Sequence, residues 1–136
     1  MKVGIPREIK NHEYRVAITP AGVHELVGRG HEVIIETGAG VGSSFADADF
    51  KAAGAQILST ADQVWESADL LLKVKEPIAE EYPRLRQDQV LFTYLHLAAS
   101  KECTDALLAS KTTSIAYETV TGADGSLPLL APMSEV

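Results

Sequence analysis

Three polar residues with complementary chemistry occur far apart in this sequence: Arg15, Lys75 and His96. An arginine presents a planar fork that binds a carboxylate bidentately, a lysine offers a point charge for a carbonyl or carboxylate oxygen, and a histidine exchanges protons near neutral pH. Together they suit a small keto acid or amino acid. Each also has an ordinary interpretation, because a lone Arg or Lys in a loop is most often solvated and a histidine at a strand end is most often structural.

The segments around these residues predict where they lie. Lys75 directly follows the apolar run Leu70–Val74, and His96 directly follows Val90–Leu95; both runs have the character of strands. Arg15 lies in a polar loop after the first predicted strand. Ligands of open α/β sheets bind beyond the carboxyl ends of the strands. We therefore expect three different loops to bring the three side chains to one crevice.

The chain as a whole alternates short β-rich runs with helical stretches, which is typical of an α/β fold with a largely parallel sheet. The expected strands are Lys2–Ile5, His31–Glu36, Gln56–Leu58, Leu70–Val74, Val90–Leu95 and Ser114–Tyr117. Helices are expected from Pro20 toward Gly30, over Asp47–Ala53, from Thr60 through Trp65, and over 101–110. This order predicts a flavodoxin-like or Rossmann-like three-layer sandwich with a mostly parallel sheet.

Capping residues mark several helix ends. Thr19 is suited to the N-cap before Pro20, and Gly30 stands where a left-handed residue ends a helix. Thr60-Ala61-Asp62-Gln63 has the spacing of a capping box, and Ser100 is suited to cap the helix that follows it. A turn is expected at 122–126, with a hairpin into 127–130 as one possibility.

The glycine-rich loop Gly38–Ser43 is the one segment that resembles a phosphate cradle, but it lacks the full fingerprint. A dinucleotide-binding loop has the pattern G-x-G-x-x-G and runs directly into a helix. Here Ser43 stands where the third glycine of the pattern belongs, and the next expected helix begins only at Asp47. We interpret the loop as a structural turn.

Other conspicuous side chains have structural interpretations. Cys103 and Trp65 are expected in the core. The acidic residues Glu76, Glu80 and Glu81 are interpreted as a solvated face, although Glu76 beside Lys75 could orient that lysine.

Composition narrows the function classes. The 136 residues carry a formal net charge of −7, which argues against nucleic acid or an anionic membrane as a partner because such binding needs clustered Lys and Arg. A single cysteine excludes an intramolecular disulfide and a multi-cysteine zinc site, and we expect no metal site. Without an apolar leader or a membrane-length run, a soluble cytoplasmic protein is expected.

The chain shows no internal linker or repeat, so residues 1–136 are expected to form one domain. Ala131–Val136 has the character of a helix that has only begun, which favours a fragment of a longer protein.

The first 20 residues resemble the alanine dehydrogenase and transhydrogenase α-subunit superfamily. The resemblance rests on Met1–Glu8 and on Asn11–Pro20, which contains Arg15-Val16-Ala17 followed by Thr19-Pro20. Leu72–Pro77 and Phe92–Ala98, with their lysine and histidine, resemble the alanine dehydrogenase branch, because transhydrogenase chains usually lack those two residues. The resemblance spans the whole chain but only the first part of such an enzyme.

The resemblance implies an NAD-dependent enzyme that interconverts L-alanine and water with pyruvate and ammonium. It implies that Arg15 and Lys75 hold the substrate, that His96 is the general acid/base, and that Ser134 contacts NAD. The chain then corresponds to the amino-terminal substrate domain, with the cofactor-binding Rossmann domain absent, and would be inactive alone. The parent enzymes are commonly homo-hexamers.

Two alternatives stay open at this level: a fragment of a nicotinamide nucleotide transhydrogenase subunit, and a non-catalytic folding or binding module. Lys75 and His96 favour the dehydrogenase over the transhydrogenase.

Overall fold

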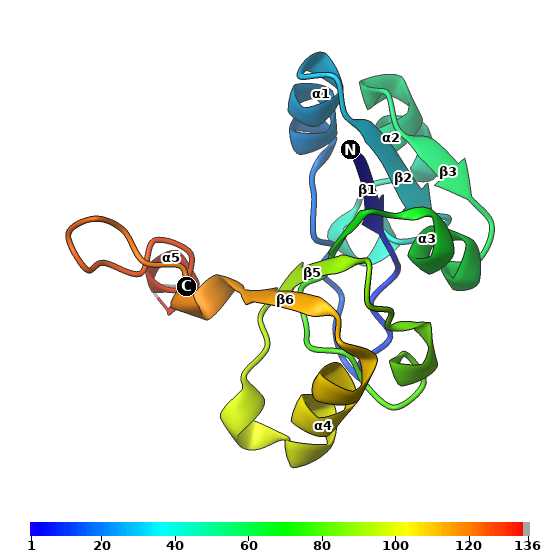
Figure 1. Cartoon of the computed structure of the whole chain (residues 1–136). Helices are drawn as coiled ribbons and strands as arrows, with labels where there is room; N and C mark the ends of the chain where they lie inside the picture. Colours follow the sequence, from blue (N-terminus) through cyan, green and yellow to red (C-terminus); the bar gives the residue numbers. More distant parts are fainter. Residues whose placement is uncertain (135–136) are drawn as a thin grey trace.

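A six-stranded, all-parallel sheet forms the centre of the molecule in the computed structural model, which describes residues 1–134 (Figure 1). The strands are β1 Lys2–Ile5, β2 Glu32–Glu36, β3 Gln56–Leu58, β4 Leu70–Leu72, β5 Val90–Thr93 and β6 Thr113–Ala116. Their order across the sheet is β3-β2-β1-β4-β5-β6. The chain therefore winds outward from β1 in one direction and then, from β4, in the other.

The helices and short 3-10 turns connect these strands. They are α1 Pro20–Gly28, η1 Val41–Ser43, α2 Asp47–Ala53, α3 Ala61–Ser67, η2 Tyr82–Arg84, η3 Leu97–Ala99, α4 Lys101–Ser110, η4 Tyr117–Thr119 and α5 Ala131–Ser134. No helix among the described residues is long and apolar enough to cross a membrane.

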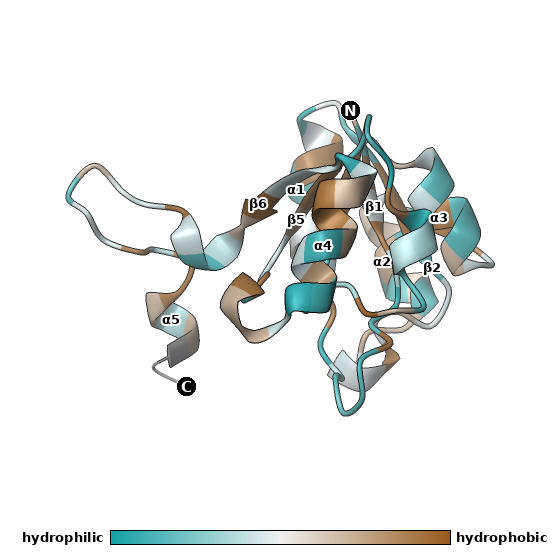
Figure 2. Ribbon diagram, turned by 60° about the horizontal axis from the view of Figure 1, so that its bottom comes forward, coloured by the Kyte–Doolittle hydropathy of each residue, from teal (hydrophilic) through white to brown (hydrophobic). Residues whose placement is uncertain are grey.

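Two hydrophobic clusters lie on opposite faces of the sheet, because alternate residues of a strand point to opposite sides. In β2, Val33 and Ile35 belong to the cluster that includes Val23 of α1 and Phe50 of α2. Ile34 between them belongs to the other cluster, with residues of α3 and α4. The polar outer sides of the helices are visible in Figure 2. The predicted three-layer α/β sandwich is confirmed.

The predicted caps are confirmed. The Thr19 hydroxyl accepts from the Gly22 N–H at 3.1 Å, and Ser100 Oγ accepts from the Cys103 N–H at 3.2 Å. In the capping box, Thr60 Oγ1 accepts from the Gln63 N–H while Gln63 Oε1 accepts from the Thr60 N–H. The helix that this box opens continues to Ser67, two residues beyond the expected end.

Several expectations about strand bounds are wrong. β2 begins at Glu32, one residue later than expected. β4 and β5 end at Leu72 and Thr93, two residues earlier than expected. The Lys73 and Tyr94 N–H groups still donate to backbone carbonyls, but the Val74 and Leu95 N–H groups donate to the carboxylates of Glu8 and Glu118 and not to a neighbouring strand. β6 is displaced by one residue, to Thr113–Ala116. A turn does form at 122–125, but 127–130 is not a strand. In Figures 1 and 2 the chain after β6 instead leaves the sheet and ends in α5.

Candidate functional site

The sheet has its topological switch point between β1 and β4, whose connections lead in opposite directions. Such a point opens a crevice at the carboxyl ends of the two strands, where ligands of doubly wound folds bind. The loop after β1 carries Arg15, the segment after β4 carries Lys75, and the segment after the neighbouring β5 carries His96. The topology thus brings the three sequence-predicted residues to the same end of the sheet.

A buried glutamate holds the backbone that carries Lys75. Glu8 Oε1 accepts from the Lys75 N–H at 3.0 Å, and Glu8 Oε2 accepts from the Val74 N–H at 3.1 Å. These two amides are therefore bonded to a side chain and not to a neighbouring strand, although Lys73 and Tyr94 still form backbone bonds between the segments that follow β4 and β5. Lys75 bonds to Glu8 through its backbone N–H and not through its side-chain ammonium group.

Glu8 is itself part of a buried ion-pair triad with Lys73 and Glu81. Lys73 Nζ lies 3.0 Å from Glu8 Oε1 and 3.2 Å from Glu81 Oε2, and all three side chains are no more than 2% exposed. Burial raises the pKa of the Glu81 carboxyl, while the Lys73 charge opposes that shift. The triad links the loop after β1 to the segment after β4 through charges that water does not screen.

The expectation of a solvated acidic face is therefore wrong for Glu81, which is buried against Lys73. Glu80 is exposed as expected. Glu76 forms an ion pair with Lys10 from the loop after β1, so the orienting contact suggested for it with Lys75 is not what the structure shows.

A second glutamate holds the backbone of His96. Glu118 Oε2 accepts from the His96 N–H at 2.9 Å, and Glu118 Oε1 accepts from the Leu95 N–H at 3.0 Å. His96 has a left-handed backbone with φ 47°, which costs a non-glycine residue about 1 kcal/mol. The two hydrogen bonds offset this cost and hold the backbone that carries the exposed imidazole.

Lys75 and His96 line one cavity of about 490 Å³, whose walls also include Tyr94, Glu118 and Met133. It has the size of a small-ligand site, and it combines an ammonium, an imidazole and apolar surface. The structure therefore brings these two predicted residues together.

Arg15 lines a neighbouring cavity of about 440 Å³, and Tyr94 and Met133 belong to the walls of both. Its guanidinium is bonded to Glu13: Nη2 donates to Oε1 at 2.7 Å and Nε donates to Oε2 at 2.8 Å. The Arg15 guanidinium holds the pKa of the Glu13 carboxyl below its ordinary value, and Lys75 contributes to the same shift. The cavity of Arg15 thus adjoins the cavity of Lys75 and His96, and the charges of Arg15 and Lys75 both act on the Glu13 carboxylate.

Tyr94, which lines both cavities, belongs to a cluster of aromatic rings. The Tyr94 and Tyr117 rings lie 4.8 Å apart, and Tyr117 also packs on Phe92 at 4.3 Å. Burial raises the pKa of the Tyr117 hydroxyl. Tyr94 Oη donates to the Leu129 carbonyl oxygen. These contacts fix the segment after β6 against β5, and this segment brings Met133 to the site.

The glycine loop after β2 has a structural role, as predicted. A Cβ on Gly42 would lie 2.5 Å from the Tyr14 carbonyl oxygen, and one on Gly40 would lie 2.6 Å from the Phe50 ring. Ser43 Oγ donates to the same Tyr14 oxygen at 3.0 Å. The two glycines are needed because the loop packs closely against Tyr14 and Phe50, and the loop supports the segment that carries Arg15.

The remaining predicted residues are placed as follows. Ser134 is the last residue of α5, and its side chain lies outside the described residues. Cys103 and Trp65 are 1% and 2% exposed, which confirms their assignment to the core. Within residues 1–134 no group of three His, Cys, Asp or Glu side chains could hold a metal ion.

Sequence reasoning missed the glutamates that position the site. Three of the predicted site residues donate their own backbone N–H to one of them: Arg15 to Glu13, Lys75 to Glu8 and His96 to Glu118, at 2.9–3.0 Å. One signal was available, because the charge of Lys73 within the apolar run Leu70–Val74 requires a buried partner.

Comparisons with known proteins give the chain its relatives. The family model "Alanine dehydrogenase/PNT, N-terminal domain" matches residues 4–136. Alanine dehydrogenases of Mycolicibacterium smegmatis and Halomonas elongata are 76% and 60% identical over all 136 residues. The chain spans 37% of the length of both.

Two solved structures share the fold. A structure of L-alanine dehydrogenase is 52% identical with a TM-score of 0.95, and the match covers 98% of this chain and 37% of that one. A transhydrogenase from Sinorhizobium meliloti is 30% identical with a TM-score of 0.80, over 87% of this chain and 35% of that one.

Proposed function

Since the chain belongs to the alanine dehydrogenase/PNT N-terminal domain family, we propose that it is the substrate-binding part of an NAD-dependent L-alanine dehydrogenase. The observation that carries the proposal is the cavity shared by Lys75 and His96, with Arg15 in the adjoining wall. A guanidinium, an ammonium and an imidazole around a small cavity match the carboxylate, the 2-oxo group and the proton transfers of pyruvate and alanine.

In this proposal Arg15 binds the substrate carboxylate and Lys75 binds the carboxylate or the carbonyl oxygen. His96 exchanges a proton with the C2 oxygen as the carbinolamine forms and collapses. The Tyr94 and Met133 side chains cover the apolar side of the substrate and restrict the access of water. The backbone N–H groups of Lys75 and His96 donate to Glu8 and Glu118. These bonds hold the two residues in place and leave the ammonium and imidazole groups unused by the glutamates.

NAD, when bound, supplies the hydride acceptor. The described residues lack a dinucleotide-binding loop, because no G-x-G-x-x-G follows a strand and Gly40 and Gly42 pack closely against Phe50 and Tyr14. We therefore assign the cofactor to the longer remainder that the relatives possess, with Ser134 as a contact. The 136-residue chain alone is proposed to be inactive.

By the same relationship we propose a cytoplasmic enzyme that assembles as a homo-hexamer. Pyruvate or alanine is its small-molecule partner. The transhydrogenase alternative shares the fold, but at 30% identity against 76% for the dehydrogenase of M. smegmatis. The dehydrogenase also accounts for Lys75 and His96.

A hybrid enzyme tests the proposal. In it, this chain replaces the matching 136 residues of the M. smegmatis alanine dehydrogenase, to which it is 76% identical. We expect alanine-dependent reduction of NAD within about tenfold of the unmodified enzyme, and a loss of at least about 100-fold in Arg15→Ala, Lys75→Ala and His96→Ala. The exposed Arg29→Ala is the control and should retain activity.

A folded hybrid without activity would contradict the dehydrogenase assignment. A pyruvate titration of the 136-residue chain, followed by NMR, then separates the alternatives. Shifts at Lys75 and His96 that vanish in Lys75→Ala indicate a substrate domain, whereas a transhydrogenase piece would show none.

A further inference from the structure

The side chain that holds Arg15 is more deeply buried than Arg15 itself. The Glu13 side chain is 6% exposed and the Arg15 side chain is 49% exposed. Glu13 receives three hydrogen bonds from Arg15, from Nη2 at 2.7 Å, Nε at 2.8 Å and the backbone N–H at 2.9 Å. The glutamate therefore acts as a fixed support, and the arginine is the group that it holds.

These bonds occupy only one edge of the guanidinium. A guanidinium can bind a carboxylate along its Nε–Nη2 edge or along its Nη1–Nη2 edge. Glu13 takes the first edge. The contact found for Nη1 is with Met133 Sδ at 3.9 Å, and sulfur is a weak acceptor. Met133 lines both cavities of the site, so the second edge lies beside the wall that separates them.

Accepting the proposed function, we infer that Glu13 is a positioning and specificity-determining residue for the substrate. It fixes the Nη1–Nη2 edge of Arg15 beside Met133 as the place where the substrate carboxylate binds. It also adds a negative charge at the site, which restricts the site to substrates with one carboxylate.

The electrostatic part follows from the neighbours of Glu13. Its carboxyl interacts with both Arg15 and Lys75, and both cations lower its pKa, so the group is ionised at neutral pH. The other charges that face the site belong to the pairs already described, namely Lys10 with Glu76 and Lys73 with Glu8 and Glu81, and to Glu118. A second carboxylate on the ligand would meet the Glu13 charge. At about 6 Å and an effective dielectric constant of about 40, this repulsion changes affinity about tenfold.

Kinetics of the hybrid enzyme with Glu13→Gln test the inference. Glutamine has the same shape, but its amide N–H₂ replaces one of the two oxygens that accept hydrogen bonds from the Arg15 guanidinium. We expect the KM for pyruvate to rise about tenfold with kcat within about threefold, because binding is lost equally in the ground and transition states. The activity ratio of ketomalonate, a three-carbon 2-oxo dicarboxylate, to pyruvate should rise about tenfold.

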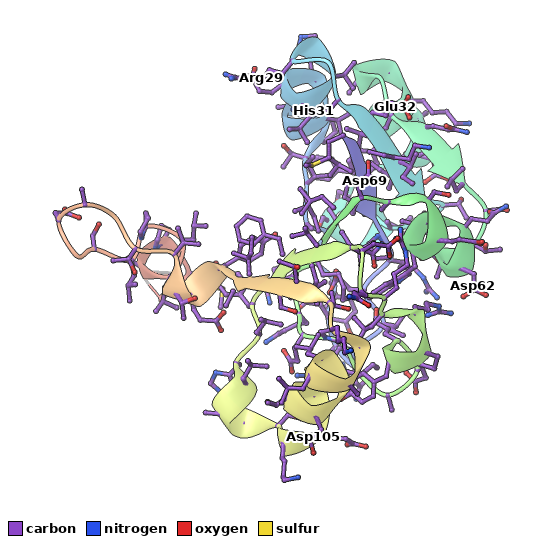
Figure 3. The ribbon with its side chains drawn as sticks, in the orientation of Figure 1. Arg29, His31, Glu32, Asp62, Asp69 and Asp105 are labelled. Atoms are coloured by element: carbon purple, nitrogen blue, oxygen red, sulfur yellow. The ribbon has the colours of Figure 1, made fainter. Side chains whose placement is uncertain are left out.

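Two further variants separate charge from geometry. Glu13→Asp keeps the charge but shortens the support, so the KM for pyruvate should rise while the ketomalonate ratio stays low. Glu25→Gln removes a similar glutamate, bonded to Arg29 at 2.8 Å on exposed α1, and should change neither value. Figure 3 shows Arg29 at the periphery of the molecule.

The outcomes are distinguishable. If the unsubstituted hybrid is active but Glu13→Gln leaves the pyruvate KM and the ketomalonate ratio unchanged, the inference about Glu13 is wrong and the proposed function stands. If Glu13→Gln lowers the melting temperature and weakens both acids equally, the glutamate is merely structural and the inference also fails. If the unsubstituted hybrid is folded but inactive, both the function and the role of Glu13 are refuted.

Discussion

Replacement of Lys73 by methionine should destabilise the chain strongly at neutral pH. Lys73 Nζ is the cation between two buried carboxylates, Glu8 at 3.0 Å and Glu81 at 3.2 Å, so these oxygens lie no more than about 6 Å apart. At an effective dielectric constant of about 20, two charges at that distance repel by about 3 kcal/mol. Breaking a buried ion pair by removing one partner costs about 3–5 kcal/mol, and we expect Lys73→Met to fall in that range.

The pH dependence of this loss has a definite sign. Burial raises the pKa of Glu81 above its ordinary value, so the folded chain retains this proton to a higher pH than the unfolded chain does, and the contribution of this carboxyl to stability falls as the pH rises. Without Lys73 the pKa of Glu81 should rise further. The destabilisation of Lys73→Met should therefore shrink as the pH is lowered from about 8 to about 5, and Lys73→Met combined with Glu81→Gln should recover part of it.

Urea unfolding of the 136-residue chain at several pH values measures both effects. The control is Lys101→Met, which removes an equally long lysine from an exposed pair with Asp105 and should change the free energy of unfolding by less than about 0.5 kcal/mol. The reasoning is refuted if Lys73→Met unfolds within about 1 kcal/mol of the unsubstituted chain at pH 7, or if its loss does not depend on pH.

Three other predictions concern the supports of the site. Gly42→Ala places a Cβ 2.5 Å from the Tyr14 carbonyl oxygen, so we expect a destabilisation of about 1–3 kcal/mol by urea unfolding and weaker pyruvate binding by NMR titration. Glu118→Ala frees the His96 amide, so the left-handed backbone should relax; hybrid activity should fall at least about tenfold while the melting temperature stays within a few degrees. The Cys103 thiol is buried and its pKa is raised, so its reaction with a thiol reagent at pH 8 should be slow in the folded chain and fast in urea; fast reaction without urea would contradict the packing.

Much of the fold could be predicted because local signals decided it. The helix Asp47–Ala53, ended by Gly54 with φ 113°, and the strand Gln56–Leu58 both have the predicted bounds. Capping and alternation are properties of neighbouring residues, and a single sequence contains them. The strand ends after Leu72 and Thr93 could not be predicted in this way, because the carboxylates that take the Val74 and Leu95 amides come from distant segments.

The sequence was sufficient to predict that Lys75 and His96 lie close together, but not to predict the glutamates that hold their backbone. Lys75 and His96 stand at predicted strand ends, and the switch-point rule places such residues together. Whether they bind substrate stays a prediction. The interpretation of Glu81 as solvated was wrong because its environment is set by Lys73 and Glu8. Neighbouring residues in the sequence do not carry that information.

The way in which glutamates are used here explains how an acidic chain can present a cationic site. A carboxylate that accepts a backbone N–H fixes a residue without occupying its side chain, so Lys75 and His96 keep their functional groups available. The same carboxylates place negative charge beside the cations and reduce their mutual repulsion before a substrate arrives. At Arg15 the glutamate also bonds the side chain, because Glu13 accepts from Nε and Nη2 as well as from the backbone N–H and leaves the Nη1–Nη2 edge beside Met133. Glu8 and Lys75 lie 67 positions apart in the sequence, so no motif of neighbouring residues contains this arrangement.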